Sequence, residues 1–154
     1  MPEINRVAPD FSLLSDAGDK LRLKDLRGHP VVLYFYPKDD TTGCTAEACE
    51  FRDLFPRFKK SKAVILGVSP DPVKAHVKFK AKYDLPFTLL ADTEHAVCEL
   101  YGVWKEKSMY GRTYMGVERS TFLIDAKGKL ARAWIKVSPT GHAEEVAAAI
   151  AGLG

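Results

Sequence analysis

The sequence predicts an α/β fold in which helices flank a mixed central sheet. Short apolar segments rich in β-branched and aromatic residues alternate along the chain with amphipathic segments of helical period. Near the end of the chain, two apolar segments flank residues 126–129, a Gly-containing turn typical of a β-hairpin. With 154 residues, 46% of them hydrophobic and 28% charged, the chain can bury one core, so we expect a single domain over residues 1–154.

The N-terminal part predicts a β-hairpin followed by a buried strand. Residues 10–14 and 20–23 flank a turn rich in Gly and Asp at residues 16–19, and we expect them to be peripheral strands. Residues 30–36 are almost continuously apolar, with β-branched and aromatic side chains, and Pro37 follows at once. This pattern predicts a strand that is buried on both faces at the centre of the sheet.

Helices and strands then alternate to the end of the chain. A helical pattern begins near Cys44, and Pro56 is expected to end or kink it. A second helix is expected over residues 71–83, where Pro72 suits the first turn. The remaining expected elements are strands at residues 63–68, 87–91, 120–125 and 130–135, a short helix that Asp92 or Thr93 caps and that runs to Tyr101, and an Ala-rich helix at residues 144–151.

Composition and charge exclude several classes of function. The 23 Lys and Arg residues against 20 Asp and Glu give a formal net charge of +3, and the basic residues are scattered, so we expect no nucleic-acid binding. The longest apolar stretches, residues 31–36 and 63–68, fall far short of the ~20 residues that cross a bilayer, so we expect no transmembrane segment, and residues 1–6 lead us to expect no export signal. Three cysteines favour a reducing compartment, so we expect a cytoplasmic protein. No metal-ligand spacing or phosphate-loop pattern occurs, so we expect no metal and no cofactor.

The loop before Cys44 is the strongest candidate for a functional site. In open α/β sheets, functional groups gather where strands give way to loops and helix N-termini, and Cys44 lies at such a place. A cysteine in the first turn of a helix has its thiolate stabilised by unpaired N–H groups and by the helix dipole. Thr41 can supply a hydroxyl donor, Gly43 allows close approach of the backbone, and Pro37 stiffens the loop.

Each of these residues also has an ordinary structural interpretation. A lone cysteine at a helix start, such as Cys44, is more often a small buried hydrophobic residue than a nucleophile. Thr41 fits a turn, and Cys49, on the polar side of the predicted helix, fits an incidental half-exposed thiol. Cys98 lies in an apolar helical pattern and is expected to pack in the core without a catalytic role.

The pattern Pro37-x-x-x-Thr41-x-x-Cys44 resembles the active-site motif of the peroxiredoxins. A second cysteine five residues later, Cys49, is similar to the Q subgroup, also called the bacterioferritin-comigratory-protein type. The resemblance covers nearly the whole chain and includes residues 8–11, 101–103 and 118–125. It implies a thioredoxin-like fold. It also makes a functional role the preferred interpretation of Cys44 and Thr41.

The resemblance implies a thiol-dependent peroxidase that reduces hydrogen peroxide and organic hydroperoxides in antioxidant defence. Cys44 would form a sulfenic acid and then an intramolecular disulfide with Cys49, which thioredoxin or a similar dithiol would reduce, without metal or organic cofactor. Q-type relatives are often monomers, and we expect a monomer here. Arg119 matches the active-site arginine of the family, whose planar charge suits a thiolate and a peroxide oxygen.

We expect Pro37, Gly43 and Glu47 to contribute to substrate binding. The position of Glu47 allows two interpretations. In the first turn of a helix, an acidic residue normally lies at the surface and complements the helix dipole, and we prefer this interpretation. Alternatively, Glu47 orients Arg119.

Two other functions compete with the peroxidase. A dithiol–disulfide oxidoreductase could use the same fold, although the usual Cys-x-x-Cys is absent. A non-enzymatic binding or chaperone-like protein could keep the fold with ordinary cysteines. Only the peroxidase should gain a Cys44–Cys49 bridge rapidly after one equivalent of peroxide.

Overall fold

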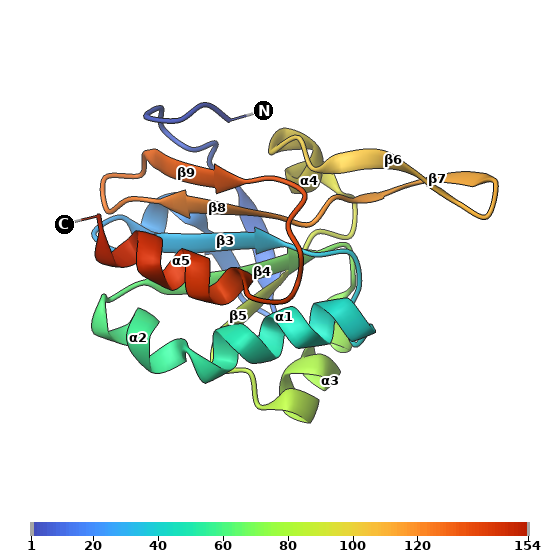
Figure 1. Ribbon diagram of the computed structural model, residues 1–154, viewed down its shortest axis with the longest axis horizontal. Coiled ribbons are helices and arrows are strands. Elements are labelled where there is room, and N and C mark those ends of the chain that lie inside the picture. Colours follow the sequence, from blue (N-terminus) through green and yellow to red (C-terminus); the bar gives the residue numbers. More distant parts are fainter. Residues whose placement is uncertain (1, 154) are drawn as a thin grey trace.

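The apolar strand expected over residues 30–36 is β3 (Val31–Phe35), and all five of its side chains are buried. In the computed structural model, which describes residues 2–153, β3 lies inside a seven-stranded mixed sheet of order β2-β1-β5-β4-β3-β8-β9 (Figure 1). It pairs in parallel with β4 and antiparallel with β8. The other strands of this sheet are β1 (Ser12–Ser15), β2 (Lys20–Arg22), β4 (Val64–Ser69), β5 (Thr88–Ala91), β8 (Ser120–Ile124) and β9 (Leu130–Trp134).

Helices cover both faces of this sheet, as the sequence predicts. On one face, side chains of α1 (Thr42–Asp53), α2 (Phe55–Lys60), α3 (Val73–Tyr83) and α5 (His142–Ala151) pack with Val32 and Tyr34 of β3. On the other face, α4 (Ala96–Leu100) and the short 3₁₀ helix Leu23–Leu26 pack against the alternate residues of the same strand, which include Leu33. Successive side chains of a strand point to opposite faces, so one buried strand serves two cores.

Stacked aromatic rings fix α1 over the sheet. The Tyr34 ring of β3 stacks on the Phe51 ring of α1, with centroids 4.8 Å apart and planes at 27°. The Tyr36 ring also stacks with Tyr34, with centroids 5.4 Å apart, and the rings of Phe58 of α2 and Phe51 have centroids 5.8 Å apart. Aromatic pairs of this kind contribute beyond their buried area, so the C-terminal half of α1 is firmly held.

The helix boundaries confirm most of the sequence-based assignments and correct two. Pro56 ends α1, as predicted, because a second helix, α2, begins around it. Helix α3 begins at Val73, so Pro72 is its N-cap residue and not part of its first turn. The N-cap residue of α4 is His95, not Asp92 or Thr93, although the Asp92 carboxylate accepts hydrogen bonds from the backbone N–H groups of Val97 and Cys98, at 3.2 and 2.8 Å.

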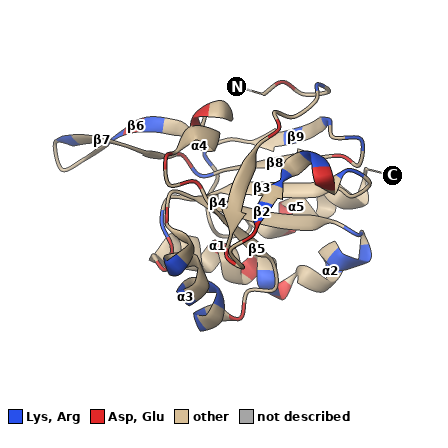
Figure 2. Cartoon of the chain, turned by 180° about the vertical axis from the view of Figure 1, so that it is seen from behind, with Lys and Arg blue, Asp and Glu red and all other residues tan. Residues whose placement is uncertain are grey.

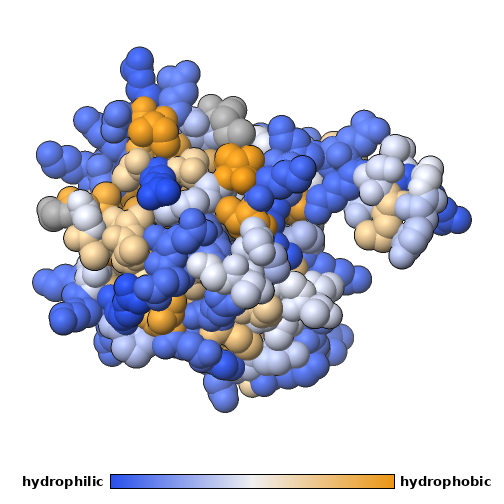
Figure 3. Space-filling view, in the orientation of Figure 1, coloured by the Kyte–Doolittle hydropathy of each residue, from blue (hydrophilic) through white to orange (hydrophobic). Residues whose placement is uncertain are grey.

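A second, two-stranded sheet was not predicted from the sequence. Strands β6 (Trp104–Met109) and β7 (Arg112–Val117) form an antiparallel hairpin that projects from the body of the molecule (Figures 1 and 3). Most of its side chains are exposed, so it lacks the apolar alternation that marks a strand in the sequence. Its turn, Tyr110-Gly111, has positive φ at both residues (51° and 78°), the geometry of a tight hairpin turn.

Basic side chains are spread over several elements and do not gather in one stripe (Figure 2). Among the helices of residues 2–153, none has both the length and the apolar composition that crossing a membrane requires.

We predict that Gly67→Ala destabilises the protein by about 1–3 kcal/mol, because an overpacked core must shift its neighbours. Gly67 lies in β4 opposite Tyr34, and a Cβ atom there would lie 2.9 Å from Leu89 Cδ2 and from the Tyr34 ring. Urea denaturation measures the change. Gly152→Ala, at the end of α5, is the matched control and should change stability little, because a Cβ atom there would lie 3.5 Å from its nearest neighbour. Equal stability of the two variants would contradict the packing of Tyr34 on β4.

Candidate active site

Cys44 lies in the first turn of α1, directly after the loop that leaves β3. Thr41 is the N-cap residue of the helix, with extended φ and ψ of −94° and 159°, and its carbonyl accepts the backbone N–H of Thr45 at 2.8 Å. Cys44 is 2% exposed and belongs to the core between α1 and the sheet. The thiol is therefore buried near the positive end of the helix dipole, where a thiolate is stabilised.

Arg119 connects Cys44 to a carboxylate on the same helix. It follows β7 and precedes β8, and its Nη2 donates to Cys44 Sγ at 3.3 Å while its Nη1 donates to Glu47 Oε1 at 2.8 Å. Burial disfavours its charge, but Glu47 and Cys44 outweigh that effect and raise the pKa of Arg119. A permanently charged guanidinium thus contacts the sulfur of the predicted nucleophile.

The interpretation of Glu47 as a surface acid is wrong, because Glu47 is 0% exposed and pairs with Arg119. Burial raises the pKa of Glu47 to about 7, although Arg119 acts in the opposite direction. Among the described residues, Glu47 Oε2 has no hydrogen-bond partner. A signal for this burial was present in the sequence: Cys44, Glu47, Ala48 and Phe51 have the spacing i, i+3, i+4, i+7 of one helix face.

The small residue before Cys44 leaves room for the guanidinium. A Cβ atom at Gly43 would lie 3.2 Å from Arg119 Nη2 and 3.5 Å from Pro139 Cγ. Thr41 is exposed, and its hydroxyl donates a hydrogen bond to the carbonyl of Lys38 at 2.9 Å, within the loop. Pro37 is half-buried where the chain leaves β3.

The three cysteines are free thiols in different surroundings. Cys49 is half-buried and lies on the same unbroken helix as Cys44. Residues five apart on an ideal helix have Cα atoms roughly 8.6 Å apart. Cys98 lies on the opposite face of the sheet, fully buried, which confirms its predicted core position. Burial, together with a hydrogen bond to Asp92, raises the pKa of Cys98 well above its ordinary value.

The projecting hairpin contributes one further charge to the site. Lys107 of β6 is half-buried, and burial followed by repulsion from Arg119 lowers its pKa, while Cys44 raises it. Lys107 was not among the predicted site residues, since the hairpin itself was missed. No spacing in the sequence connects it with Cys44.

Comparisons with known proteins support a redox function. The model of the AhpC/TSA family matches residues 4–133. A putative peroxiredoxin bcp from Coxiella burnetii is 54% identical over 94% of this chain and 95% of its own length, and peroxiredoxin Bcp from Bacillus subtilis is 52% identical over 93% and 91%.

Solved structures agree with the sequence relatives. A cysteine-to-serine mutant of PrxQ from Xylella fastidiosa superposes with a TM-score of 0.92 and 38% identity, over 98% of this chain and 96% of that one. The bacterioferritin comigratory protein of Xanthomonas campestris, studied for its alkyl peroxide reduction activity, gives a TM-score of 0.87 and 45% identity, over 92% and 90%. The chain is thus similar to these proteins in both sequence and fold.

We predict that Glu47 makes the protein less stable as the pH rises. Its pKa goes from 4.5 in the unfolded chain to about 7 in the folded protein, so between these values the unfolded chain releases a proton that the folded protein keeps. At 1.36 kcal/mol per pKa unit, the wild type should lose about 3 kcal/mol of unfolding free energy relative to Glu47→Gln between about pH 4 and about pH 8. Urea denaturation of the reduced proteins measures this.

Glu144→Gln is the control for this measurement. The hydrogen bond with Arg57 lowers the pKa of Glu144, so the contribution of Glu144 to stability falls as the pH falls, opposite to that of Glu47. This contribution is small because the ion pair is exposed, so Glu144→Gln should change the pH dependence of stability only slightly. A pH-independent difference between wild type and Glu47→Gln would show that folding does not shift the pKa of Glu47.

Proposed function

This chain belongs to the AhpC/TSA family, among the Bcp peroxiredoxins, and we propose from this premise that it is a thiol peroxidase in which the Cys44 thiolate attacks the peroxide. The observation that best supports this assignment is the hydrogen bond from Arg119 Nη2 to Cys44 Sγ at 3.3 Å. A fixed cation at the sulfur favours the thiolate, which is the nucleophilic form of cysteine.

In the first step, the sulfur of Cys44 attacks one peroxide oxygen, an S–O bond forms and the O–O bond breaks. Cys44 is oxidised to a sulfenic acid, and the leaving oxygen takes a proton and departs as water or an alcohol. Arg119 is placed to stabilise the charge that moves from sulfur to oxygen. For Thr41 to donate to the peroxide, its hydroxyl must rotate away from the Lys38 carbonyl. By analogy with the X. campestris relative, alkyl peroxides are included among the substrates.

In the second step, the Cys49 thiolate attacks the sulfenic sulfur, water leaves and a disulfide forms. A dithiol protein then reduces this disulfide by thiol exchange. The folded helix does not allow the bond, because a disulfide requires Cα atoms within about 7 Å, less than the roughly 8.6 Å of an ideal helix.

The first turns of α1 are suited to opening for this step. Thr42 and Thr45 are mediocre helix formers, and Thr42 is exposed while Gly43 is half-buried. Phe51, in contrast, is completely buried and holds the following turn on the sheet. Opening therefore involves the N-terminal turns, while the rest of the helix stays packed.

We propose further that the protein acts as a monomer in the cytoplasm, with thioredoxin or a similar dithiol protein as its reductant. The proposed compartment rests on three free cysteines, which suit a reducing environment.

Cysteine variants test the proposed mechanism. Cys49→Ser should consume one equivalent of peroxide and then stop with Cys44 as a sulfenic acid, because no second thiol resolves it. Cys44→Ser should not react, because a serine hydroxyl is not ionised near neutral pH. Cys98→Ser is the control and should turn over like the wild type, since Cys98 lies across the sheet. Intact-protein mass spectrometry and stopped-flow turnover with thioredoxin measure these outcomes. Normal cycling of Cys49→Ser would remove Cys49 from the mechanism.

Hydrogen exchange tests the opening of α1. After oxidation with one equivalent of peroxide, residues 43–50 should lose protection relative to the reduced protein, because the disulfide cannot form within the helix. Strand β3 should keep its protection and serves as the internal control. Unchanged protection of residues 43–50, with the Cys44–Cys49 bond verified by mass, would contradict the need for unwinding.

A further inference from the structure

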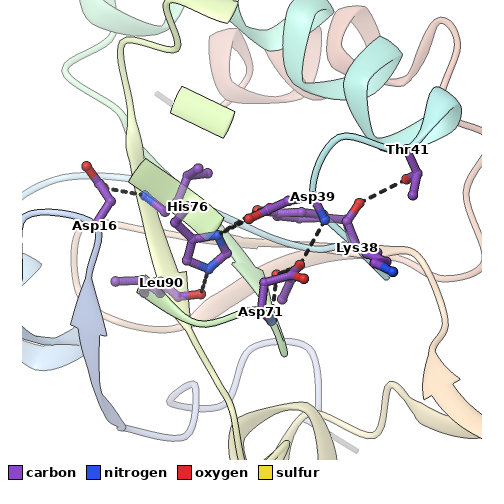
Figure 4. A network of polar contacts seen from close by, with 10 residues as sticks. Asp16, Lys38, Asp39, Thr41, Asp71, His76 and Leu90 are labelled. Atoms are coloured by element: carbon purple, nitrogen blue, oxygen red, sulfur yellow. Dashed lines mark hydrogen bonds and ion pairs between the residues drawn. The ribbon is translucent and has the colours of Figure 1, made fainter. Parts of the chain in front are cut away.

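A buried polar network lies beside the loop that carries the active-site motif (Figure 4). His76 of α3 is 0% exposed, and both of its ring nitrogens have partners. Its Nδ1 lies 2.7 Å from Asp39 Oδ2 and its Nε2 lies 2.9 Å from the carbonyl oxygen of Leu90. The other carboxylate oxygen of Asp39 accepts the Tyr36 hydroxyl at 2.5 Å.

The partners determine where the protons lie. A backbone carbonyl only accepts, so His76 Nε2 carries a hydrogen. Burial, together with Tyr34 and Asp39, raises the pKa of Tyr36 well above its ordinary value, so the Tyr36 hydroxyl remains the donor to Asp39. An ionised Asp39 can then only accept at Oδ2, and Nδ1 must donate as well. A protonated Asp39 that donates to a neutral His76 would satisfy the same contacts, but an imidazolium paired with a carboxylate makes the stronger, charge-assisted hydrogen bond.

The network connects the active-site loop with three elements of the fold. Tyr36 follows β3, His76 belongs to α3, and Leu90 belongs to β5. Asp39 itself lies in the loop, two residues before Thr41, the N-cap residue of α1. The loop is thus fixed immediately before the helix turn that holds Cys44.

The backbone of the loop is held at the same point. The Asp39 N–H donates to Asp71 Oδ2 at 2.8 Å, and the same oxygen accepts the Ser69 hydroxyl at 2.6 Å. Helix α3 is in turn held by Lys80, which pairs with Asp16 at 2.9 Å. His76 therefore projects from a helix that is itself fixed to the sheet.

We propose that His76 is a positioning residue: paired as an imidazolium with Asp39, it fixes the start of α1 so that Cys44 returns to Arg119 after each opening of the helix. This inference rests on the proposed role of Cys44 as the nucleophile. The pair lies just before the segment that must unwind, so unwinding stops at Asp39 while residues 43–50 move. A loop free to drift would let Cys44 refold away from the guanidinium.

Two variants separate positioning from simple loss of packing. His76→Phe keeps a ring of similar volume but loses both hydrogen bonds, and we expect Cys44 to be oxidised about tenfold more slowly or worse, since small misplacements in active sites cost up to ~100-fold. Asp39→Asn keeps the bonds, because its amide can donate to a neutral His76 Nδ1 and still accept from Tyr36. Asp39→Asn should therefore react nearly as fast as the wild type.

Nuclear magnetic resonance of the imidazole nitrogens gives a readout that does not depend on peroxide. In the reduced wild type at neutral pH, His76 should carry protons on both Nδ1 and Nε2, whereas in Asp39→Asn it should carry one on Nε2 alone. A single proton on His76 in the wild type would overturn the ion pair. If the wild type itself does not react with peroxide, the proposed function fails, and the spectrum still decides the protonation of His76.

Tyr101→Phe is the matched control. It loses one buried hydrogen bond, from the Tyr101 hydroxyl to the Pro9 carbonyl at 2.6 Å, on the opposite face of the sheet, and should leave the rate of Cys44 oxidation unchanged. If His76→Phe does not fold, Tyr36→Phe, which removes the bond to Asp39 Oδ1 and the 3.5 Å contact with His76 Nδ1, takes its place and should also slow the reaction. Wild-type rates in the folded His76→Phe or Tyr36→Phe variant would overturn the positioning role.

Discussion

One guanidinium serves two acidic groups in a buried site, and the rest of the site is arranged around it. Arg119 donates to Cys44 Sγ and to Glu47 Oε1, which lie one helical turn apart on α1. If both groups were ionised, the site would hold two negative charges against one positive charge in a medium that screens poorly. Burial raises the pKa of Glu47, and the nearby charge of Glu50 adds to this effect, so the neutral form of Glu47 is favoured. The charge of Arg119 is thus available to the thiolate to the extent that Glu47 remains protonated.

The C-terminal half of α1 is packed more firmly on the sheet than its N-terminal turn. The C-terminal half carries Phe51, which lies against the Tyr34 ring, while the residues around the buried Cys44 in the N-terminal turn are exposed or half-buried and have poor helix propensity. The preceding loop is fixed again at Asp39. A short segment that can open therefore lies between two fixed points. Such an arrangement limits the motion to the residues whose chemistry requires it.

The sequence predicted the parts of the structure that are determined by residues close together in the chain. The buried strand β3, the hairpins at the two ends of the sheet and the position of Cys44 at a helix start follow from periodicity, turns and a spaced motif. Arg119 was found only through family resemblance, because its role depends on a contact across 75 residues of sequence. The contact between His76 and Asp39, 37 residues apart, left no such signal. The prediction for Glu47 was wrong because it rested on the helix dipole, whereas Glu47 shares a buried helix face with Phe51.

The position of Cys98 also bears on how faithfully the chain forms disulfides. Three cysteines allow three different pairings, and two of them would trap the chain in a non-productive oxidised form. The central sheet lies between Cys98 and the other two thiols, and burial keeps Cys98 protonated. A bond to Cys98 would have to form across the sheet, whereas in the proposed mechanism the Cys44–Cys49 bond requires only the opening of the first turns of α1. The sheet thus restricts oxidation to the pairing that the proposed mechanism uses, and Cys98 takes no part in the proposed catalytic cycle.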